Sequence, residues 1–314
     1  MTGYLIKRTL SAIPILIGVS IVVFIMIKII PGDPVASLLG PTSTPAQRAA
    51  LTARLGLDQP LPVQYCQWIW HVLQGDLGTS IAKQTPVGPL VVSAFENTVI
   101  LTVFAAALAF TGGVALGAVA ALRRGRIAAT ISDLVSLVSI SVPQYSISLL
   151  LIIYVAATTH WFPTSGMFNA IDGGTWGDLA RHIVLPAIAA ALVPMGIIAR
   201  MFRATVTDVM SMDFIDALRS RGLTERGILR HAFHNTLPTL LTIAGLQLGY
   251  LLGGVIFIET VFSWPGAGLL VYQSIAQRDL PVIQAGVIVS ALAFVLVNIV
   301  VDSLQAAVDP RVRA

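Results

Sequence analysis

The sequence predicts an all-α, polytopic membrane protein with six transmembrane helices. Hydrophobic residues make up 56% of its 314 residues and charged residues only 11%, whereas soluble domains are about one quarter charged. Six apolar stretches are long enough to cross the hydrocarbon core, which takes about 20 helical residues. Lys and Arg gather in alternate loops between these stretches, as in membrane proteins whose basic loops stay cytoplasmic.

The six predicted spans are separated by loops of very different length. The first follows Lys7 and Arg8 as a signal peptide would, but its apolar run is too long for one and no small-x-small cleavage site follows. We therefore expect it to remain as an anchor. The spans run roughly from Thr9 to Ile30, Asn97 to Leu122, Ala128 to Thr158, His182 to Met201, Thr239 to Glu259 and Val282 to Asp302.

Basic residues orient these spans. They precede the first span, follow the second and the fourth, and end the chain. Six spans are consistent with this pattern only if both termini are cytoplasmic. The predicted organisation is a cytoplasmic N-terminus with the first span (1–30), an extracytoplasmic helical insertion (31–95), a transmembrane core (96–303) with a cytoplasmic loop at 202–236, and a cytoplasmic tail (304–314).

Capping signals predict two short helices in the insertion, which we expect to lie on the membrane. Thr44 and Gln47 suit the two positions of a capping box, and Gly56 is placed to end that helix. Pro62 and Gly75 bracket the second candidate in the same way.

Tryptophans in the second of these helices have two open interpretations. Tyr65, Trp68, Ile69 and Val72 recur at helical spacing. Trp68 and Trp70 fit the headgroup level of the membrane, where indole rings are favoured, and they fit the core of the insertion equally well.

Catalytic and metal-binding motifs are missing from the sequence. It contains no Gly-x-x-x-x-Gly-Lys loop, no His-Glu-x-x-His, no Gly-x-Ser-x-Gly and no paired intramembrane aspartates. His231 and His234 lie in a basic loop without further ligands, and the single Cys66 has no partner for a disulfide or a metal. We expect no catalytic, cofactor-binding or metal-binding residue on this chain, and no nucleic-acid partner.

Charged residues fall near the ends of the predicted spans. Examples are Lys28, Asp133 and Asp302. Ion-coupled transporters usually hold a titratable group near the middle of a span. This pattern weighs against a self-contained secondary transporter or channel, which stays the alternative function.

Polar, uncharged residues mark the third and fifth spans. Ser139 and Gln144 flank Pro143, and Gln247 and Tyr250 lie in the fifth span. They suit either helix packing or a translocation path for a polar solute, because such a path needs polar groups without fixed charge.

The loop at 202–236 contains the signals for the end of one helix and the start of another. Asp208 to Arg221 reads as a helix that ends at Gly222, and Thr224 can cap a second helix. Pro238 is expected to separate this second helix from the fifth span. Two short helices with a tight turn would form a rigid cytoplasmic protrusion.

Seven short motifs occur in a fixed order along the chain. They are Pro31-Gly32-Asp33-Pro34, Leu55-Gly56-Leu57-Asp58-Gln59-Pro60-Leu61, Gly75-Asp76-Leu77-Gly78-Thr79-Ser80, Arg219-Ser220-Arg221-Gly222-Leu223-Thr224, Glu259-Thr260-Val261-Phe262-Ser263-Trp264-Pro265-Gly266, Arg278-Asp279-Leu280-Pro281 and Asp309-Pro310-Arg311. With these motifs the chain resembles the first membrane subunit of bacterial binding-protein-dependent dipeptide and oligopeptide ABC importers, whose relatives carry nickel or glutathione. The resemblance covers almost the whole chain and implies the fold of a type I ABC importer permease.

The resemblance implies a non-catalytic, multi-pass permease subunit of the bacterial cytoplasmic (inner) membrane. A second homologous permease subunit would complete the path, one or two ABC ATPase subunits would bind ATP and Mg, and an extracytoplasmic binding protein would deliver substrate. The substrate itself, whether a peptide of some length, nickel or glutathione, is not identified by these motifs.

Two segments carry the functional residues that the resemblance implies. The cytoplasmic loop would couple to an ATPase. It departs from the family's general coupling motif in two residue types, because Asp216 stands in place of a Glu and Leu218 in place of an Ala. The distance from Gly222 to Leu237-Pro238 is also longer than in that motif. The loop from Thr260 to Pro281 would contact the binding protein or form a plain re-entrant turn. The coupling residues are Asp213, Asp216, Ala217, Leu218, Arg219, Arg221 and Gly222, and the binding-protein contacts are Phe262, Trp264 and Tyr272.

Overall fold

Helices account for nearly all of the regular structure. The computed structural model describes residues 2–29, 39, 44–54, 56, 58–123, 125–169 and 174–308. Within these ranges the only β-type pairing is an isolated bridge between Thr79 and Pro86. The first and last of the seven motifs, at 31–34 and 309–311, lie outside the described residues.

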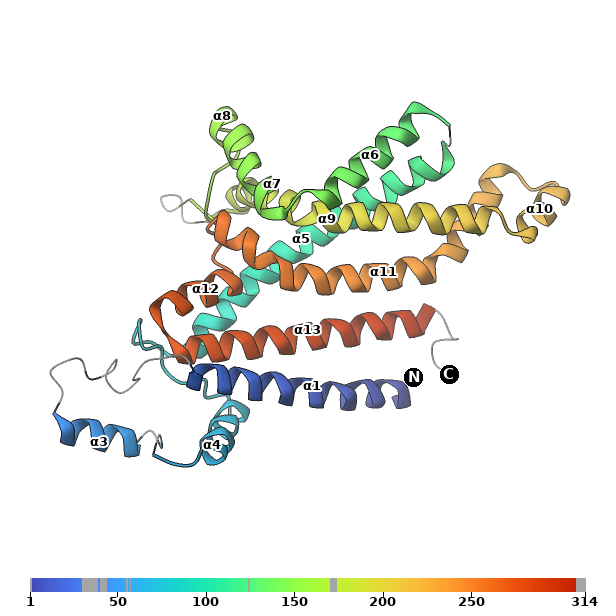
Figure 1. Ribbon diagram of the computed structural model, residues 1–314. Coiled ribbons are helices and arrows are strands. Elements are labelled where there is room, and N and C mark those ends of the chain that lie inside the picture. The colour runs from blue at the N-terminus through green and yellow to red at the C-terminus, as the bar shows by residue number, and fades with distance from the viewer. Residues whose placement is uncertain are drawn as a thin grey trace.

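Five helices are long and apolar enough to cross a membrane on their own. They lie largely side by side, with α5 crossing the others obliquely (Figure 1). Each extends beyond the predicted span, so the helices reach past the apolar stretches. The five are α1 (Thr2–Ile29), α5 (Val87–Leu122), α9 (Trp176–Met210), α11 (Glu225–Val261) and α13 (Leu280–Val308).

The third predicted span is not one straight helix. It consists of α6 (Ile127–Ser141) followed by α7 (Gln144–Leu151), η1 (Ile152–Ala156) and α8 (Ala157–Thr159), with a bend of 105° between the two halves. Val142 is extended at the break, because a residue before proline is driven out of the helical region. The stretch predicted as the third span is therefore bent at Pro143, and the described residues provide six spans if the bent pair is counted as one.

α9 is the centre of the bundle. In the most apolar 18-residue segment of α9, 67% of the residues are buried, whereas the corresponding share in the other four long helices is 22% to 28%. Glycines allow its neighbours to approach closely, as membrane helices require. A Cβ on Gly117 of α5 would lie 2.6 Å from the Ala199 carbonyl oxygen, and one on Gly196 of α9 would lie 2.6 Å from the Ser136 carbonyl oxygen of α6.

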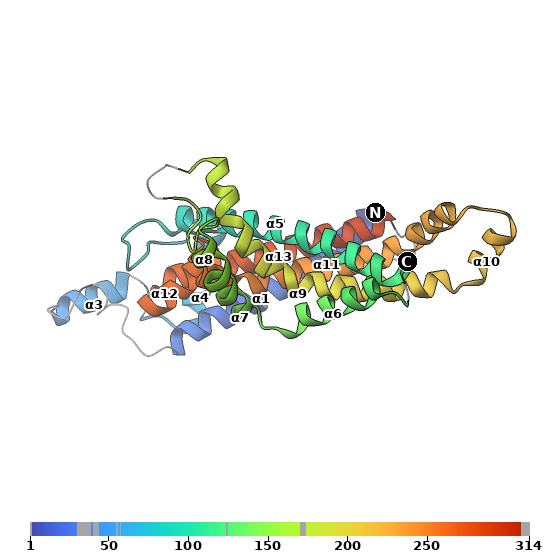
Figure 2. The ribbon, with the colours of Figure 1, turned by 90° about the horizontal axis from the view of Figure 1, so that it is seen from above.

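The molecule has two distinct ends. The start of α1 and the last turns of α13 lie at the same end as α10 (Asp213–Ser220), called here the α10 end (Figures 1 and 2). The short helices α3 (Pro45–Arg54), α4 (Leu61–Leu73) and α12 (Ala267–Gln277) lie at the opposite end, the α4 end. The segments predicted to be cytoplasmic therefore share one end.

Both short helices predicted in the insertion are present. Thr44 and Gln47 form the capping box of α3, in which the Gln47 amide donates to Thr44 Oγ1 at 3.3 Å and the Thr44 amide donates to Gln47 Oε1 at 2.9 Å. In α4 the two tryptophans have different surroundings. Trp68 packs on Phe24 of α1, whereas Trp70 is 61% exposed.

Ion pairs join neighbouring helices at the α10 end. Arg203 of α9 pairs with Asp133 of α6, and Arg8 of α1 pairs with Asp302 of α13. These contacts explain why charged residues stand near the ends of the predicted spans. Each pair links two adjacent helices.

A buried carboxylate organises the α4 end. Asp279, in the turn between α12 and α13, accepts hydrogen bonds from the Ser80 hydroxyl, the Ile81 amide (3.0 Å) and the Ala82 amide (3.2 Å). The donors lie nearly 200 residues away along the chain. The contact thus joins two of the sequence motifs, 75–80 and 278–281, into one corner.

Asp279→Ala should loosen this corner, because three donors lose their acceptor. Leaving buried donors unsatisfied costs about 1–3 kcal/mol, so amide exchange across residues 79–83 should accelerate in deuterium-exchange mass spectrometry and thermal stability in detergent should fall. Asp58→Ala is the matched control, because Asp58 is exposed. Equal exchange in the two variants would contradict the assignment.

Candidate functional site

The protrusion at the α10 end is built from the end of α9, the short helix α10 and the start of α11. α9 ends at Met210, and the Ser211 hydroxyl donates to the Asp208 carbonyl at 2.7 Å. α10 then begins at Asp213 after an extended Met212. The expected single helix from Asp208 to Arg221 was therefore wrong, since the chain turns at Ser211 before α10.

A small apolar cluster holds α10 against its neighbours. Ile215 is fully buried between Val209 of α9 and Ile228 and Ala232 of α11. Met210, Phe214, Leu218 and Leu223 pack around these four residues. This cluster is separate from the main core, and it makes the protrusion one body with the ends of both long helices.

Gly222 closes α10 with a left-handed turn. Its φ is +79°, a conformation that is costly for residues with a Cβ. The Leu223 amide donates to the Leu218 carbonyl at 3.2 Å, and the Gly222 amide donates to the Arg219 carbonyl at 2.9 Å. This is the hydrogen-bond pair of a Schellman motif. Leu218 and Leu223, the positions of its usual apolar contact, both pack against the cluster around Ile215.

The outward face of α10 is charged. The Asp216 side chain is 78% exposed and pairs with Arg219 at 3.2 Å, while Arg219 also lies 3.5 Å from Glu225. Exposed pairs of this kind stabilise a fold very little. Their arrangement is better suited to presenting charges to another molecule, together with the exposed Ala217 and Arg221. Asp213 and Asp216 also lie in the first turn of α10, where a negative charge interacts favourably with the helix dipole.

α11 connects the protrusion to the bundle without a break. Thr224 caps it, accepting a hydrogen bond from the Gly227 amide at 3.3 Å, as predicted. The helix then continues through Pro238 to Val261. The expectation that Pro238 ends a separate short helix was wrong. Because α9 is also continuous, a movement of α10 is carried directly into two core helices.

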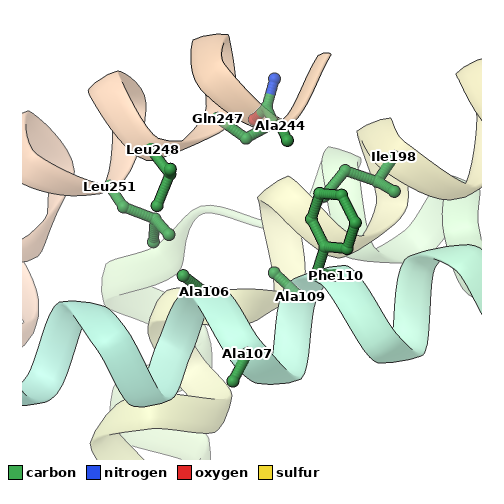
Figure 3. Close-up of a pocket in the computed structure, with 9 residues that line it drawn as sticks. All are labelled: Ala106, Ala107, Ala109, Phe110, Ile198, Ala244, Gln247, Leu248 and Leu251. Atoms are coloured by element: carbon green, nitrogen blue, oxygen red, sulfur yellow. The ribbon is translucent and has the colours of Figure 1, made fainter. Parts of the chain in front are cut away.

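Among the candidate path residues, Gln247 lines a cavity, but its amide nitrogen points away from the other lining side chains (Figure 3). A cavity of about 250 Å³ lies between α5, α9 and α11, with side chains of the three helices facing one another (Figure 3). The Gln247 Oε1 atom is buried and has no hydrogen-bond partner. Tyr250, one turn farther along α11, is 44% exposed. The cavity is otherwise apolar, lined by Ala106, Ala107, Ala109, Phe110, Ile198, Ala244, Leu248 and Leu251.

The two candidates beside the bend contact helix backbones. Gln144 Nε2 donates to the Ala190 carbonyl of α9 at 3.3 Å. A helical carbonyl there would normally bond to residue 194, and Pro194 has no N–H. Gln144 therefore satisfies an acceptor that a proline leaves free. Ser139 is buried in α6, where its hydroxyl donates to the Val135 carbonyl at 2.8 Å.

Of the three candidates in the re-entrant turn, only Tyr272 is available to a partner. Phe262 and Trp264 are buried, whereas Tyr272 is 57% exposed. Trp264 Nε1 donates to the Asn97 carbonyl at 2.9 Å, and the Asn97 side chain donates to the Pro265 carbonyl at 2.9 Å. The turn is thus fastened to the start of the second span.

A carboxylate known from the sequence as the last residue of the fifth predicted span and the first residue of the motif 259–266 supports this turn. Glu259 is buried and accepts from the Thr98 hydroxyl at 2.6 Å and from the Leu269 amide at 3.0 Å. It caps the first turn of α12 from the end of the preceding helix. Its place in the motif 259–266 was the only signal for this role.

Within the described residues, no group of three or more His, Cys, Asp and Glu side chains could hold a metal ion. His231 and His234 both lie exposed on α11. The α10 end combines a buried apolar base with a charged outer face.

Comparison with known proteins covers the whole chain. Residues 113–314 match the family described as "Binding-protein-dependent transport system inner membrane component", and residues 1–112 match the N-terminal family of such membrane components. The glutathione transport system permease protein GsiC of Salmonella typhi is 37% identical over 314 residues, covering 100% of this chain and 99% of the relative. The dipeptide transport system permease protein DppB of Alkalihalophilus pseudofirmus is 37% identical over 333 residues, covering 100% of both chains.

A solved structure shares the fold. Inward-facing structures of the MetNI methionine ABC transporter contain a chain that aligns with a TM-score of 0.57 and 20% identity, over 70% of this chain and 96% of that one. Most of the helical arrangement described above is therefore a known one.

Gly222→Ala should destabilise the α10 turn by the cost of a left-handed alanine, about 1–2 kcal/mol. Amide exchange at residues 221–223 should then accelerate roughly 5–30-fold, measured by deuterium-exchange mass spectrometry. Gly227→Ala is the matched control, because Gly227 is helical and alanine favours a helix. Unchanged exchange in Gly222→Ala would contradict the turn geometry.

Proposed function

The chain belongs to the family of binding-protein-dependent transport system inner membrane components, and from this premise we propose that α10 is the surface on which an ATPase subunit docks. The family match extends over the whole sequence. The chain is a multi-pass inner-membrane permease subunit of an ABC importer, which is consistent with its long apolar helices. The observation that carries the docking proposal is the rigid, charged protrusion formed by α10.

ATP hydrolysis is assigned to a separate chain. The sequence contains no Gly-x-x-x-x-Gly-Lys loop of the kind that binds nucleotide phosphates. ATP and Mg would therefore be bound by the partner ATPase, and this chain would supply no catalytic residue, cofactor site or metal site. Family membership implies an ATPase partner and a second permease subunit, since ABC importers contain both.

Coupling on this proposal is mechanical. Asp216, Ala217, Arg219 and Arg221 face outward to meet the ATPase, while Leu218 and Ile215 anchor α10 to its base. Asp213 starts the helix and Gly222 closes it. A nucleotide-driven shift of the ATPase would push α10, and α11, about 55 Å long, would carry the displacement across the bilayer.

The docking proposal also orients the chain in the membrane. With the α10 end in the cytoplasm, both termini are cytoplasmic and the α4 end is extracytoplasmic. A binding protein would deliver substrate there, and the exposed Tyr272 of α12 would be a contact for it. Phe262 and Trp264 would support this surface from beneath.

We propose di- or oligopeptides as the substrate class. The relatives are named for glutathione and dipeptide transport, and both cargoes are short peptides. Gln247 and Tyr250 would contribute uncharged polar groups to the path, with Ser139 and Gln144 shaping the bend beside it. The lining of the Gln247 cavity bears no charged side chain, so the path would pass peptides of varied sequence.

Gly222→Val tests the coupling role. A β-branched residue is strained at positive φ, so the docking turn should be disrupted and ATP-driven uptake in proteoliposomes should fall about tenfold, the equivalent of roughly 1.4 kcal/mol. Asp216→Ala should have a milder effect, because its ion pair is exposed.

Gly227→Ala serves as the control for this pair and should transport normally. Insertion and co-purification of every subunit are verified for each variant. Normal uptake by a correctly assembled Gly222→Val complex would contradict the proposed coupling surface.

A further inference from the structure

An apolar stripe runs along the outside of α4. Val63, Cys66, Trp70 and Leu73 are all exposed, and their spacing of three and four residues places them on one face of the helix. Trp70 is 61% exposed and Leu73 75%. The stripe therefore lacks cover within the described part of the chain.

The opposite face of α4 packs on the side of α1. Tyr65 Oη and Ser20 Oγ are hydrogen-bonded at 2.7 Å, and the Tyr65 and Trp68 rings lie 5.5 Å and 5.9 Å from the Phe24 ring, centroid to centroid. Lys28 Nζ donates to Gln64 Oε1 at 2.6 Å. The three α1 residues are four apart, so α4 lies beside α1 and not beyond its end (Figure 1).

These contacts give α4 a depth in the membrane. The apolar span of α1 runs from Arg8 to Met26, and it contains both Ser20 and Phe24. Ser20 lies about 9 Å inside the end of that span at 1.5 Å per residue. Since α4 packs sideways at this level, its outer face looks into the bilayer near the boundary between headgroups and acyl chains.

The composition of α4 suits that boundary. No Asp, Glu, Lys or Arg occurs from Gln59 to Gly75, whereas α3, nearby, carries Arg48 and Arg54. The exposed polar residues of the α4 segment, Gln67, His71 and Gln74, gather on one side of the helix, next to the stripe. The helix thus has a protein-facing side, a polar side and an apolar side.

We propose that the stripe formed by Val63, Cys66, Trp70 and Leu73 binds the lipid of the leaflet at the α4 end, with α4 lying in the membrane interface. Interfacial helices bury their apolar face about 5–10 Å into the headgroup and acyl boundary. Trp70 is of the residue type favoured at this level. The polar side, with Gln67 and His71, faces the headgroups and water.

The role goes beyond coupling and transport. On this proposal α4 fastens the neighbouring end of α1 to the bilayer surface. With the orientation proposed above, the leaflet is the outer one, and the lipid contact itself does not depend on that orientation.

Spin labelling tests the lipid contact directly, because the chain's single cysteine, Cys66, lies in the stripe. The importer would be reconstituted in lipid nanodiscs with cysteine-free partner subunits, and a nitroxide attached to Cys66. Power-saturation EPR then compares accessibility to oxygen, which partitions into lipid, with accessibility to Ni(II)-EDDA, which stays in water. In a Cys66→Ser background, Leu73→Cys reports on the same stripe and His71→Cys on the polar side.

The expected ratio of oxygen to nickel accessibility is above one at Cys66 and Leu73→Cys, and below one at His71→Cys. A ratio below one at both stripe positions would overturn the proposal, because the stripe would then face water. Low accessibility to both reagents at these positions would also overturn it, since a partner subunit or the binding protein would then cover the stripe.

Discussion

The close packing of α9 against α5 and α6 is the constraint on which the rest of the structure depends. Glycines at 117 and 196 bring the backbones so near that any side chain at these positions would collide with a neighbouring carbonyl. With α9 held this tightly, its C-terminal end cannot move alone. The apolar cluster around Ile215 then extends this rigidity to α10 and α11. A force on the exposed helix α10 is therefore transmitted to the core helices.

Local signals predicted the parts of the fold that depend on local interactions. The apolar spans, the capping box at Thr44 and the left-handed turn at Gly222 each involve residues within a few positions of one another. The effect of each proline on its helix could not be predicted from local signals. Pro143 follows the end of a helix, whereas Pro194 and Pro238 lie inside helices. Whether a helix continues through a proline depends on tertiary contacts, such as the hydrogen bond of Gln144 to the Ala190 carbonyl.

Long-range contacts explain what sequence reasoning missed. The burial of Trp264 depends on Asn97, and the corner at Asp279 depends on Ser80, partners more than 160 residues away in each case. Local patterns contain no information on such pairs. Among the candidate site residues, the coupling residues of α10 gather on one protrusion, whereas the path candidates are divided between a cavity and a helix bend.

The central claim is that α10 docks on an ATPase, and crosslinking tests it most directly. Ala217→Cys in a Cys66→Ser background places one thiol on the exposed face of α10, and a short bifunctional reagent is applied to the complex in native membranes. The account predicts a crosslinked product that contains an ABC ATPase and that is missing when the thiol is moved to Ala49 on α3. Equal crosslinking from both positions, or none from Ala217→Cys in an assembled and active complex, would contradict it.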